Sequence, residues 1–210
     1  MTRRRERQQD LLSAAVEVFA RKGYHASTIS DIIAIAGVAR GTFYLYFKSK
    51  RAIFSRLLAD LFAELEGKVH RLDERRSAQE NLDLLRANIR EVMGYLLERP
   101  ALLRILLWEA VGLDSEFDSQ LGAFYRRLTD LIQRSLRLGI AMGLLRKLEP
   151  GVVSLSVLGS IREVLFRVSL GERLPGLDAL VDEILRFIVH GLFVPQVAAS
   201  LESAGLGGAP

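Results

Sequence analysis

The side chains best suited to chemistry lie in one short stretch, GVARGTFYLYFKSK, which runs from Gly37 to Lys50. Arg40, Lys48 and Lys50 supply positive charge, and one threonine and two tyrosines in the same stretch supply hydroxyl groups. Such groups hydrogen-bond to phosphate oxygens, and an arginine can also make a bidentate contact to the edge of a guanine. The stretch therefore favours binding to a nucleic acid.

The positive charge of the chain is concentrated in the same region. Residues 1–50 hold nine basic and four acidic side chains, a net charge of +5, whereas all 210 residues together carry +4. A charge asymmetry of this kind indicates a polyanionic partner. The run from Arg3 to Arg7 could reach into a minor groove or strengthen non-specific attraction to DNA, and we favour the second reading.

The residues that enzymes use are absent or scattered. The sequence has no cysteine, which excludes thiolate catalysis, disulfides and cysteine-ligated metals. His25, His70 and His190 lie far apart and show no metal-ligand spacing. We expect no catalytic residue, no metal site and no cofactor, and hence a protein that is not an enzyme. The missing cysteines fit a reducing cytoplasm, and the absence of an apolar run of roughly 18 residues argues against a membrane helix.

Helices must position the candidate residues, because nearly every segment has helical periodicity and none alternates like a strand. Apolar stripes and boundary residues predict about nine helices, at 4–22, 28–37, 39–47, 49–72, 78–98, 101–112, 116–143, 151–170 and 177–193. Thr28 should cap the second helix by pairing with Asp31, and Gly37 should end it. The tight turn that follows is typical of a helix-turn-helix. The expected fold class is all-α.

The third predicted helix has two different faces. Ala39, Phe43 and Phe47 fall in one arc, which should pack on the first two helices. The opposite arc contains Arg40, Gly41, Thr42, Tyr44, Leu45 and Tyr46. A glycine on an exposed helical face costs about 1 kcal/mol relative to alanine, but it lets the backbone approach a ligand closely. This outward face suits the major groove of DNA, which admits an α-helix.

Residues 28–50, TISDIIAIAGVARGTFYLYFKSK, resemble the tetracycline-repressor (TetR) family of bacterial transcriptional regulators. The likeness extends from the threonine that opens the second helix, through an Ala-Gly-Val turn, to the aromatic recognition helix and the Ser-Lys after it. The resemblance implies a sequence-specific DNA-binding transcriptional regulator, with a repressor released from a palindromic operator by a small, apolar effector as the leading reading. It also implies allostery, in which the effector shifts the fourth helix and changes the separation of two recognition helices.

Both the residues and the resemblance place DNA contacts on the second, third and fourth helices. The expected DNA-binding residues are Thr28, Ser30, Arg40, Gly41, Thr42, Tyr44, Leu45, Tyr46, Lys48 and Lys50. Arg40 is expected at a base edge, Tyr44 at a phosphate, and Lys50 at a phosphate beside the start of the fourth helix. Leu45 departs from the family, many members of which carry a polar or larger aromatic residue there. A contact of Leu45 with a thymine methyl group is one possibility.

The helices at 151–170 and 177–193 have more apolar surface than one core-facing side requires. A second copy of the chain, related by two-fold symmetry, would bury the surplus, whereas a thick monomeric core is the alternative. The expected dimer residues are Leu155, Leu158, Ile161, Leu177, Leu180, Val181, Ile184, Leu185 and Ile188. The family dimerises through this same helix pair, and a two-fold dimer predicts a palindromic operator.

By the same resemblance, a small-molecule effector binds among the helices between these regions. The candidates are polar or amphipathic residues in apolar surroundings: Arg104, Trp108, Glu109, Tyr125, Arg126 and Arg162. Each could instead be a snorkelling side chain or part of a core salt bridge. The apolar segment LLRILLWEAVGL indicates a ligand that is hydrophobic at least in part.

The expected organisation is a helix-turn-helix DNA-binding domain at 1–50, a ligand-binding and dimerisation domain at 51–194, and a flexible tail at 195–210. Two related functions stay open beside the inducible repressor. One is a dimeric DNA-binding regulator without a small-molecule inducer, and the other is an activator.

Overall fold

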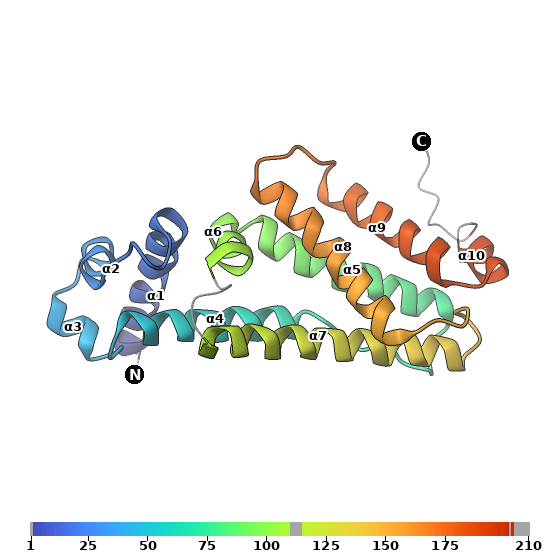
Figure 1. Cartoon of the computed structure of the whole chain (residues 1–210), viewed down its shortest axis with the longest axis horizontal. Coiled ribbons are helices and arrows are strands. Elements are labelled where there is room, and N and C mark those ends of the chain that lie inside the picture. Colours follow the sequence, from blue (N-terminus) through green and yellow to red (C-terminus); the bar gives the residue numbers. More distant parts are fainter. Residues whose placement is uncertain (1, 110–114, 202, 204–210) are drawn as a thin grey trace. The chain divides into compact units, whose positions relative to one another are not determined.

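The computed structural model describes residues 2–109, 115–201 and 203 (Figure 1). Within this part of the chain there are ten α-helices, one π-helical turn and no β-strand beyond an isolated bridge between Leu145 and Phe193. The expected all-α fold class is confirmed, with one α-helix more than the sequence predicted.

The chain divides into two compact units. The first comprises Met1–Leu65 and Arg99–Gly122, and the second comprises Glu66–Glu98 and Ala123–Pro210. These units differ from the division at residue 50 that we expect on functional grounds, because α6 and the start of α7 belong with the N-terminal helices.

The first unit is built on α1 and holds the predicted DNA-binding segment. Its elements are α1 (Thr2–Lys22), α2 (Ile29–Ala36), α3 (Arg40–Tyr44), α4 (Lys50–Gly67) as far as Leu65, α6 (Pro100–Arg104), the π-helical turn η1 (Ile105–Glu109) and the start of α7 (Ser115–Ala141). Helix α1 packs against α2, α6 and η1. The rings of Phe19, Phe54 and Phe117 are fully buried, and the Phe54 ring meets the other two edge-on with centroid distances of 5.0 and 5.1 Å.

Capping residues stand at the C-terminal end of α1 and at the start of α4. Gly23 has a positive φ of 79°, and its N–H donates to the Phe19 carbonyl over 2.9 Å, which ends α1. The Ala52 N–H donates to Ser49 Oγ over 3.1 Å, so Ser49 caps α4.

The second unit packs α5 along α9. Its helices are α5 (Ala78–Leu97), the remainder of α7, α8 (Pro150–Ser169), α9 (Leu177–Leu192) and α10 (Pro195–Leu201). Two ion pairs join α5 to α9, Arg86 with Asp182 and Arg90 with Asp178, each with an N–O distance of 2.6 Å.

Helix α4 ends at Gly67, whereas the sequence predicted a helix as far as residue 72. Two buried asparagines of α5 explain the difference. The Asn88 amide bonds both the N–H and the carbonyl of His70, over 2.9 and 2.7 Å, and the Asn81 amide does the same for Asp73, over 3.1 and 2.9 Å. Because side chains satisfy these backbone groups, the segment does not need to be helical.

Two other predicted boundaries are wrong. The helix predicted at 101–112 is α-helical only to Arg104 and continues as the π-helical turn η1, while 110–112 lie outside the described residues. The flexible tail predicted from residue 195 begins instead with helix α10, whose side chains Ala198 and Leu201 are buried. Burial of these two side chains stabilises a segment that was predicted from the sequence to be flexible.

Candidate nucleic-acid interface

Helices α2 and α3 are joined by a three-residue turn, Gly37 to Ala39. Gly37 has φ 63° and ψ 34°, a left-handed conformation that favours glycine, and its N–H donates to the Ile33 carbonyl. Ala39 is extended, and its carbonyl accepts from the Thr42 N–H over 2.9 Å, which starts α3. The predicted helix-turn-helix is confirmed.

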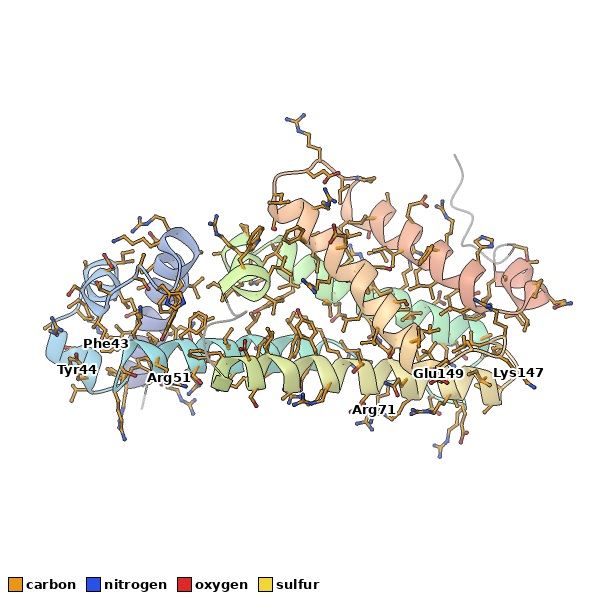
Figure 2. The ribbon with its side chains drawn as sticks, in the orientation of Figure 1. Phe43, Tyr44, Arg51, Arg71, Lys147 and Glu149 are labelled. Carbon is orange, nitrogen blue, oxygen red and sulfur yellow. The ribbon has the colours of Figure 1, made fainter. Side chains whose placement is uncertain are left out.

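Phe43 of α3 and Phe47 just after it are buried, whereas the other side of α3 is exposed. Figure 2 labels Phe43 and Tyr44 on this helix. Phe43 and Phe47 are 0% and 5% exposed, whereas Tyr44 and Leu45 are 48% and 73% exposed. The helix itself spans only Arg40–Tyr44, but the Phe47 N–H still donates to the Phe43 carbonyl over 2.9 Å, which keeps both rings on one side. Ala39 was expected on the buried face; it is exposed, because it precedes the helix as its N-terminal cap residue.

Gly41 lies in the middle of the exposed side of α3. A Cβ atom built on Gly41 would meet nothing within 4 Å, and its φ is not positive. Neither packing nor backbone conformation therefore requires a glycine at this position. The missing side chain leaves the helix backbone open to close approach from outside.

The ten expected DNA-binding residues all belong to the first unit. The exposed ones are Thr28, Ser30, Arg40, Gly41, Tyr44, Leu45 and Lys48, and the half-buried ones are Thr42, Tyr46 and Lys50. Among the described residues, no ion pair engages Arg40 or Lys48. Two cations beside α3 are thus available to a ligand.

Thr28 caps α2 through a reciprocal arrangement with Asp31. The Asp31 N–H donates to Thr28 Oγ1 over 3.1 Å, while the Thr28 N–H and hydroxyl lie 2.9 Å from Asp31 Oδ2. The capping box predicted from the sequence is confirmed. The Lys22 ammonium, together with the Thr28 hydroxyl and N–H, lowers the pKa of the Asp31 carboxyl to about 2.

Lys50, the first residue of α4, points its ammonium at the loop between α1 and α2. Its Nζ donates to the carbonyls of Tyr24, Ser27 and His25 over 2.6, 2.8 and 3.3 Å. It also lies 4.3 Å from the centroid of the Tyr24 ring. Partial burial lowers the pKa of this ammonium. Local sequence patterns could not predict this arrangement, because the three partners are backbone atoms more than twenty residues away.

Comparison with known proteins agrees with this geometry. Residues 11–57 match the sequence model of the bacterial regulatory proteins of the tetR family. The fatty acid metabolism regulator protein of Bacillus subtilis (strain 168) is 27% identical over 194 residues, which cover 91% of this chain and 98% of that protein. The matched segment holds the helix-turn-helix, and the similarity continues through the remaining helices.

Residues 11–57 of the chain are a TetR-family sequence. A crystal structure of the Bacillus subtilis regulator FadR in complex with stearoyl-CoA has a TM-score of 0.71 and 27% identity, and covers 87% of this chain and 98% of that one. The complex of SmeT with triclosan has a TM-score of 0.72 at 23% identity, covers 91% and 94% of the two chains, and supports the fold alone. The homologues of this chain are transcriptional regulators, and this chain is likewise a DNA-binding transcriptional regulator and not an enzyme.

The second unit of this regulator exposes apolar side chains on α8 and α9. Leu155 is 65% exposed, and Val152 and Phe187, which the sequence reading missed, are 62% and 68% exposed. Leu158, Ile161 and Leu177 are half-buried. The apolar character all around both helices was the signal for this surface, but it did not distinguish which side faces outward.

Five of the expected dimer residues are core residues of the second unit. Leu180, Val181, Ile184, Leu185 and Ile188 of α9 are all buried within the chain itself. The α9 stripe therefore fills the core beside α5. Phe187 of α9 lies outside this stripe and is exposed.

The six effector candidates belong to different parts of the chain. Arg104 and Trp108 lie in the first unit and are exposed, and the side chain of Glu109 lies outside the described residues. In the second unit, Arg126 and Arg162 are exposed, and Tyr125 is half-buried. Burial raises the pKa of the Tyr125 phenol, and the positive charge of Arg162 partly opposes this.

A small apolar hollow in the second unit includes none of these candidates. Its lining residues are Leu72, Ala78, Asn81, Leu82, Leu85, Ser135, Leu138, Gly139, Met142, Leu144, Leu145 and Phe193. Its volume of about 50 Å³ is far below the several hundred Å³ that a small-molecule site usually requires. This hollow does not hold an effector of ordinary size in the conformation described.

The described residues contain neither a cluster of metal ligands nor a membrane-spanning helix. No group of three or more histidine, aspartate or glutamate side chains within them could hold a metal ion. None of the helices in that part of the chain combines the length and apolar character required to cross a membrane.

Proposed function

We propose that this regulator is a homodimeric repressor that binds a palindromic operator through the exposed side of α3 and is released by a small, partly apolar effector. The observation that carries the DNA-binding part is Gly41, a helical glycine that the fold does not require, placed between exposed Arg40 and Tyr44. A bare backbone at this place permits contact with base pairs at the floor of a major groove.

The proposed contacts divide into base-reading and backbone-binding groups. Arg40, Gly41 and Thr42 face base edges, and Leu45, exposed beside them, contacts a thymine methyl group. The phosphate-binding residues are Thr28, Ser30, Tyr44, Tyr46 and Lys48. Lys50 belongs to the same surface, and its role is developed below.

The first test is selection of bound sequences from random duplex DNA by the full-length protein. The expected product is an inverted repeat whose half-sites are separated in accord with a two-fold dimer. Recovery of a single asymmetric site would contradict the dimeric arrangement. Recovery of no enriched sequence at low salt would contradict sequence-specific binding altogether.

The exposed apolar side chains of α8 and α9 are the proposed contact between two copies. Leu155 and Phe187 are more than half exposed, and burying such side chains favours association by roughly 1.5–3 kcal/mol each. Replacing both with arginine should give a monomer in analytical ultracentrifugation that retains its helical circular dichroism. A matched control is the double change to arginine of two exposed residues of α1, Gln9 and Ser13. A dimer that survives the change at Leu155 and Phe187 would contradict this interface.

A long-chain acyl-CoA is the effector class proposed first, because the FadR structure with stearoyl-CoA aligns over most of this chain at 27% identity. The proposed contact residues within the second unit are Tyr125, Arg126 and Arg162. Arg104, Trp108 and Glu109 of the first unit stay predictions from the sequence. The arginines suit the phosphates of such a ligand, since guanidinium groups bind phosphate in a bidentate manner. The hollow of about 50 Å³ in the second unit is too small for an acyl-CoA. Binding of this effector therefore requires a conformation with a larger cavity.

The effector proposal is tested by titrating the operator complex with stearoyl-CoA, with coenzyme A alone and with stearate. Release by stearoyl-CoA but not by coenzyme A would support an acyl-CoA effector, and release by stearate alone would indicate a free fatty acid. If none of them changes DNA affinity, other apolar compounds must be screened. Failure of every compound would favour the regulator without an inducer.

A further inference from the structure

The ammonium group of Lys50 is fully engaged within the protein. An ammonium has three hydrogens to donate, and Nζ of Lys50 has three carbonyl acceptors, on Tyr24, His25 and Ser27. The ring of Tyr24 lies under the same nitrogen, 4.3 Å from ring centroid to Nζ. Lys48, two residues earlier, is exposed and forms no ion pair among the described residues.

The loop that receives Lys50 is held from other directions as well. The buried Ser27 donates its hydroxyl to the Tyr24 carbonyl over 2.7 Å. The Tyr24 ring packs against Phe19 and Phe54, with centroid distances of 5.7 and 4.7 Å. The loop carbonyls thus have a fixed position to which a lysine from α4 can bind.

This loop leads directly into the proposed DNA-binding surface. Ser27 is followed by Thr28, the capping residue of α2, whose partner Asp31 is also paired with Lys22. The position of the loop therefore determines where the first turn of α2 lies. Lys50, the first residue of α4, binds the loop that precedes this turn.

We propose that Lys50 is a positioning residue: its ammonium stays on the carbonyls of Tyr24, His25 and Ser27 when the protein binds DNA, and it supports binding by fixing the start of α2. The proposal rests on the proposed DNA-binding function and replaces the phosphate contact expected from the sequence. A move of the ammonium to a phosphate would leave three carbonyl oxygens without this donor. Lys48 is exposed and forms no ion pair among the described residues, so it can contact a phosphate without leaving such an acceptor unsatisfied.

The salt dependence of DNA binding distinguishes the two roles. A lysine that neutralises a phosphate contributes about 0.9 to the slope of log K against log salt concentration, whereas a lysine bound to carbonyls contributes nothing. We expect Lys50→Met to lower the affinity of the full-length protein for its selected duplex roughly tenfold, which corresponds to about 1.4 kcal/mol, with the wild-type slope. The comparison variant Lys48→Met should reduce the slope by about 0.9 for each lysine removed.

Lys50→Arg gives a second test, because it keeps the positive charge but replaces the compact ammonium with a wider planar group. A positioning role predicts that Lys50→Arg loses affinity almost as Lys50→Met does. Retention of wild-type affinity by Lys50→Arg, together with a reduced slope for Lys50→Met, would overturn the proposal.

Two further measurements do not depend on the DNA affinity of the variants: one follows the loop in the free protein, and the other follows the Lys50 ammonium in the wild type. Hydrogen exchange of the free protein should be faster at the amides of residues 24–31 in Lys50→Met than in wild type or Lys48→Met, and equal rates would overturn the proposal. In wild type, the ammonium NMR signal of Lys50 should keep its free-state shift when the selected duplex is added. If the protein binds no duplex, the proposed function fails, while hydrogen exchange still decides whether Lys50 holds the loop.

Discussion

The exposed side of α3 and the loop between α1 and α2 lie in the same unit. They differ in whether their polar groups have partners within the protein. On α3, Arg40 forms no ion pair among the described residues, and Gly41 leaves its backbone open. In the loop, the carbonyls of Tyr24 and Ser27 are bonded by Lys50. A surface whose groups lack internal partners is suited to a ligand, and a segment whose groups are satisfied is suited to holding that surface in place.

The largest effect should come from removing the inward support of α3. Phe43→Ala deletes a fully buried ring, and a change of this kind costs about 3–5 kcal/mol of unfolding free energy. Leu45→Ala, on the exposed side, should change stability by no more than about 0.5 kcal/mol. Urea denaturation of both variants measures the difference. Equal losses for the two variants would contradict the assignment of inner and outer sides.

The next effect concerns base reading by the exposed side. Arg40→Ala should lower affinity for the selected duplex by about 1–3 kcal/mol and relax the preference at one base position in each half-site. The reason is the loss of a bidentate contact to guanine. Binding is measured by fluorescence anisotropy on the selected duplex and on single-base variants of it. An equal loss on every sequence would assign Arg40 to the phosphate backbone instead.

Gly41 permits a prediction in which stability and binding change in opposite directions. Gly41→Ala should raise the unfolding free energy by up to about 1 kcal/mol, because alanine is the better helix former and its Cβ meets nothing within 4 Å. The same methyl group should lower DNA affinity by obstructing close approach. Thermal unfolding and duplex titration of one protein preparation test both parts. A stabilised variant with unchanged DNA affinity would show that the backbone does not approach the bases here.

The smallest effect concerns the cap of α2 at low pH. The pKa of Asp31 is about 2 in the folded protein against an ordinary value of 3.8, so the folded state favours its carboxylate. The resulting stabilisation is present above the ordinary value and is lost as the pH falls from there toward 2. Asp31→Asn should therefore flatten the decline of stability between about pH 4 and pH 2 in urea denaturation. A decline as steep as in wild type would exclude Asp31 as its source.

Local patterns in the sequence were enough to predict the helix-turn-helix. Thr28 with Asp31, and Gly37, act on neighbouring residues only, so their effects follow from short-range geometry. The inward side of α3 was also correct for Phe43 and Phe47, because helical periodicity determines which side chains share a face.

Features that depend on residues far apart in the chain could not be predicted from local sequence patterns. The partners of Lys50 are carbonyls in another loop, and the end of α4 depends on Asn81 and Asn88 of α5. The apolar pattern of α9 likewise could not separate the buried Leu185 from the exposed Phe187, since both fit an amphipathic helix. Such assignments require knowledge of what packs on each side.

The most direct test of the central claim is hydroxyl-radical footprinting of the full-length protein, read by mass spectrometry, with and without the selected duplex. The exposed Tyr44 and Leu45 should be oxidised readily in the free protein and protected in the complex, while the exposed Trp108 serves as an internal reference. Protection of Tyr44 and Leu45 with unchanged oxidation of Trp108 is the predicted result. Unchanged oxidation of Tyr44 and Leu45 in a saturated complex would contradict the claim that this side of α3 contacts DNA.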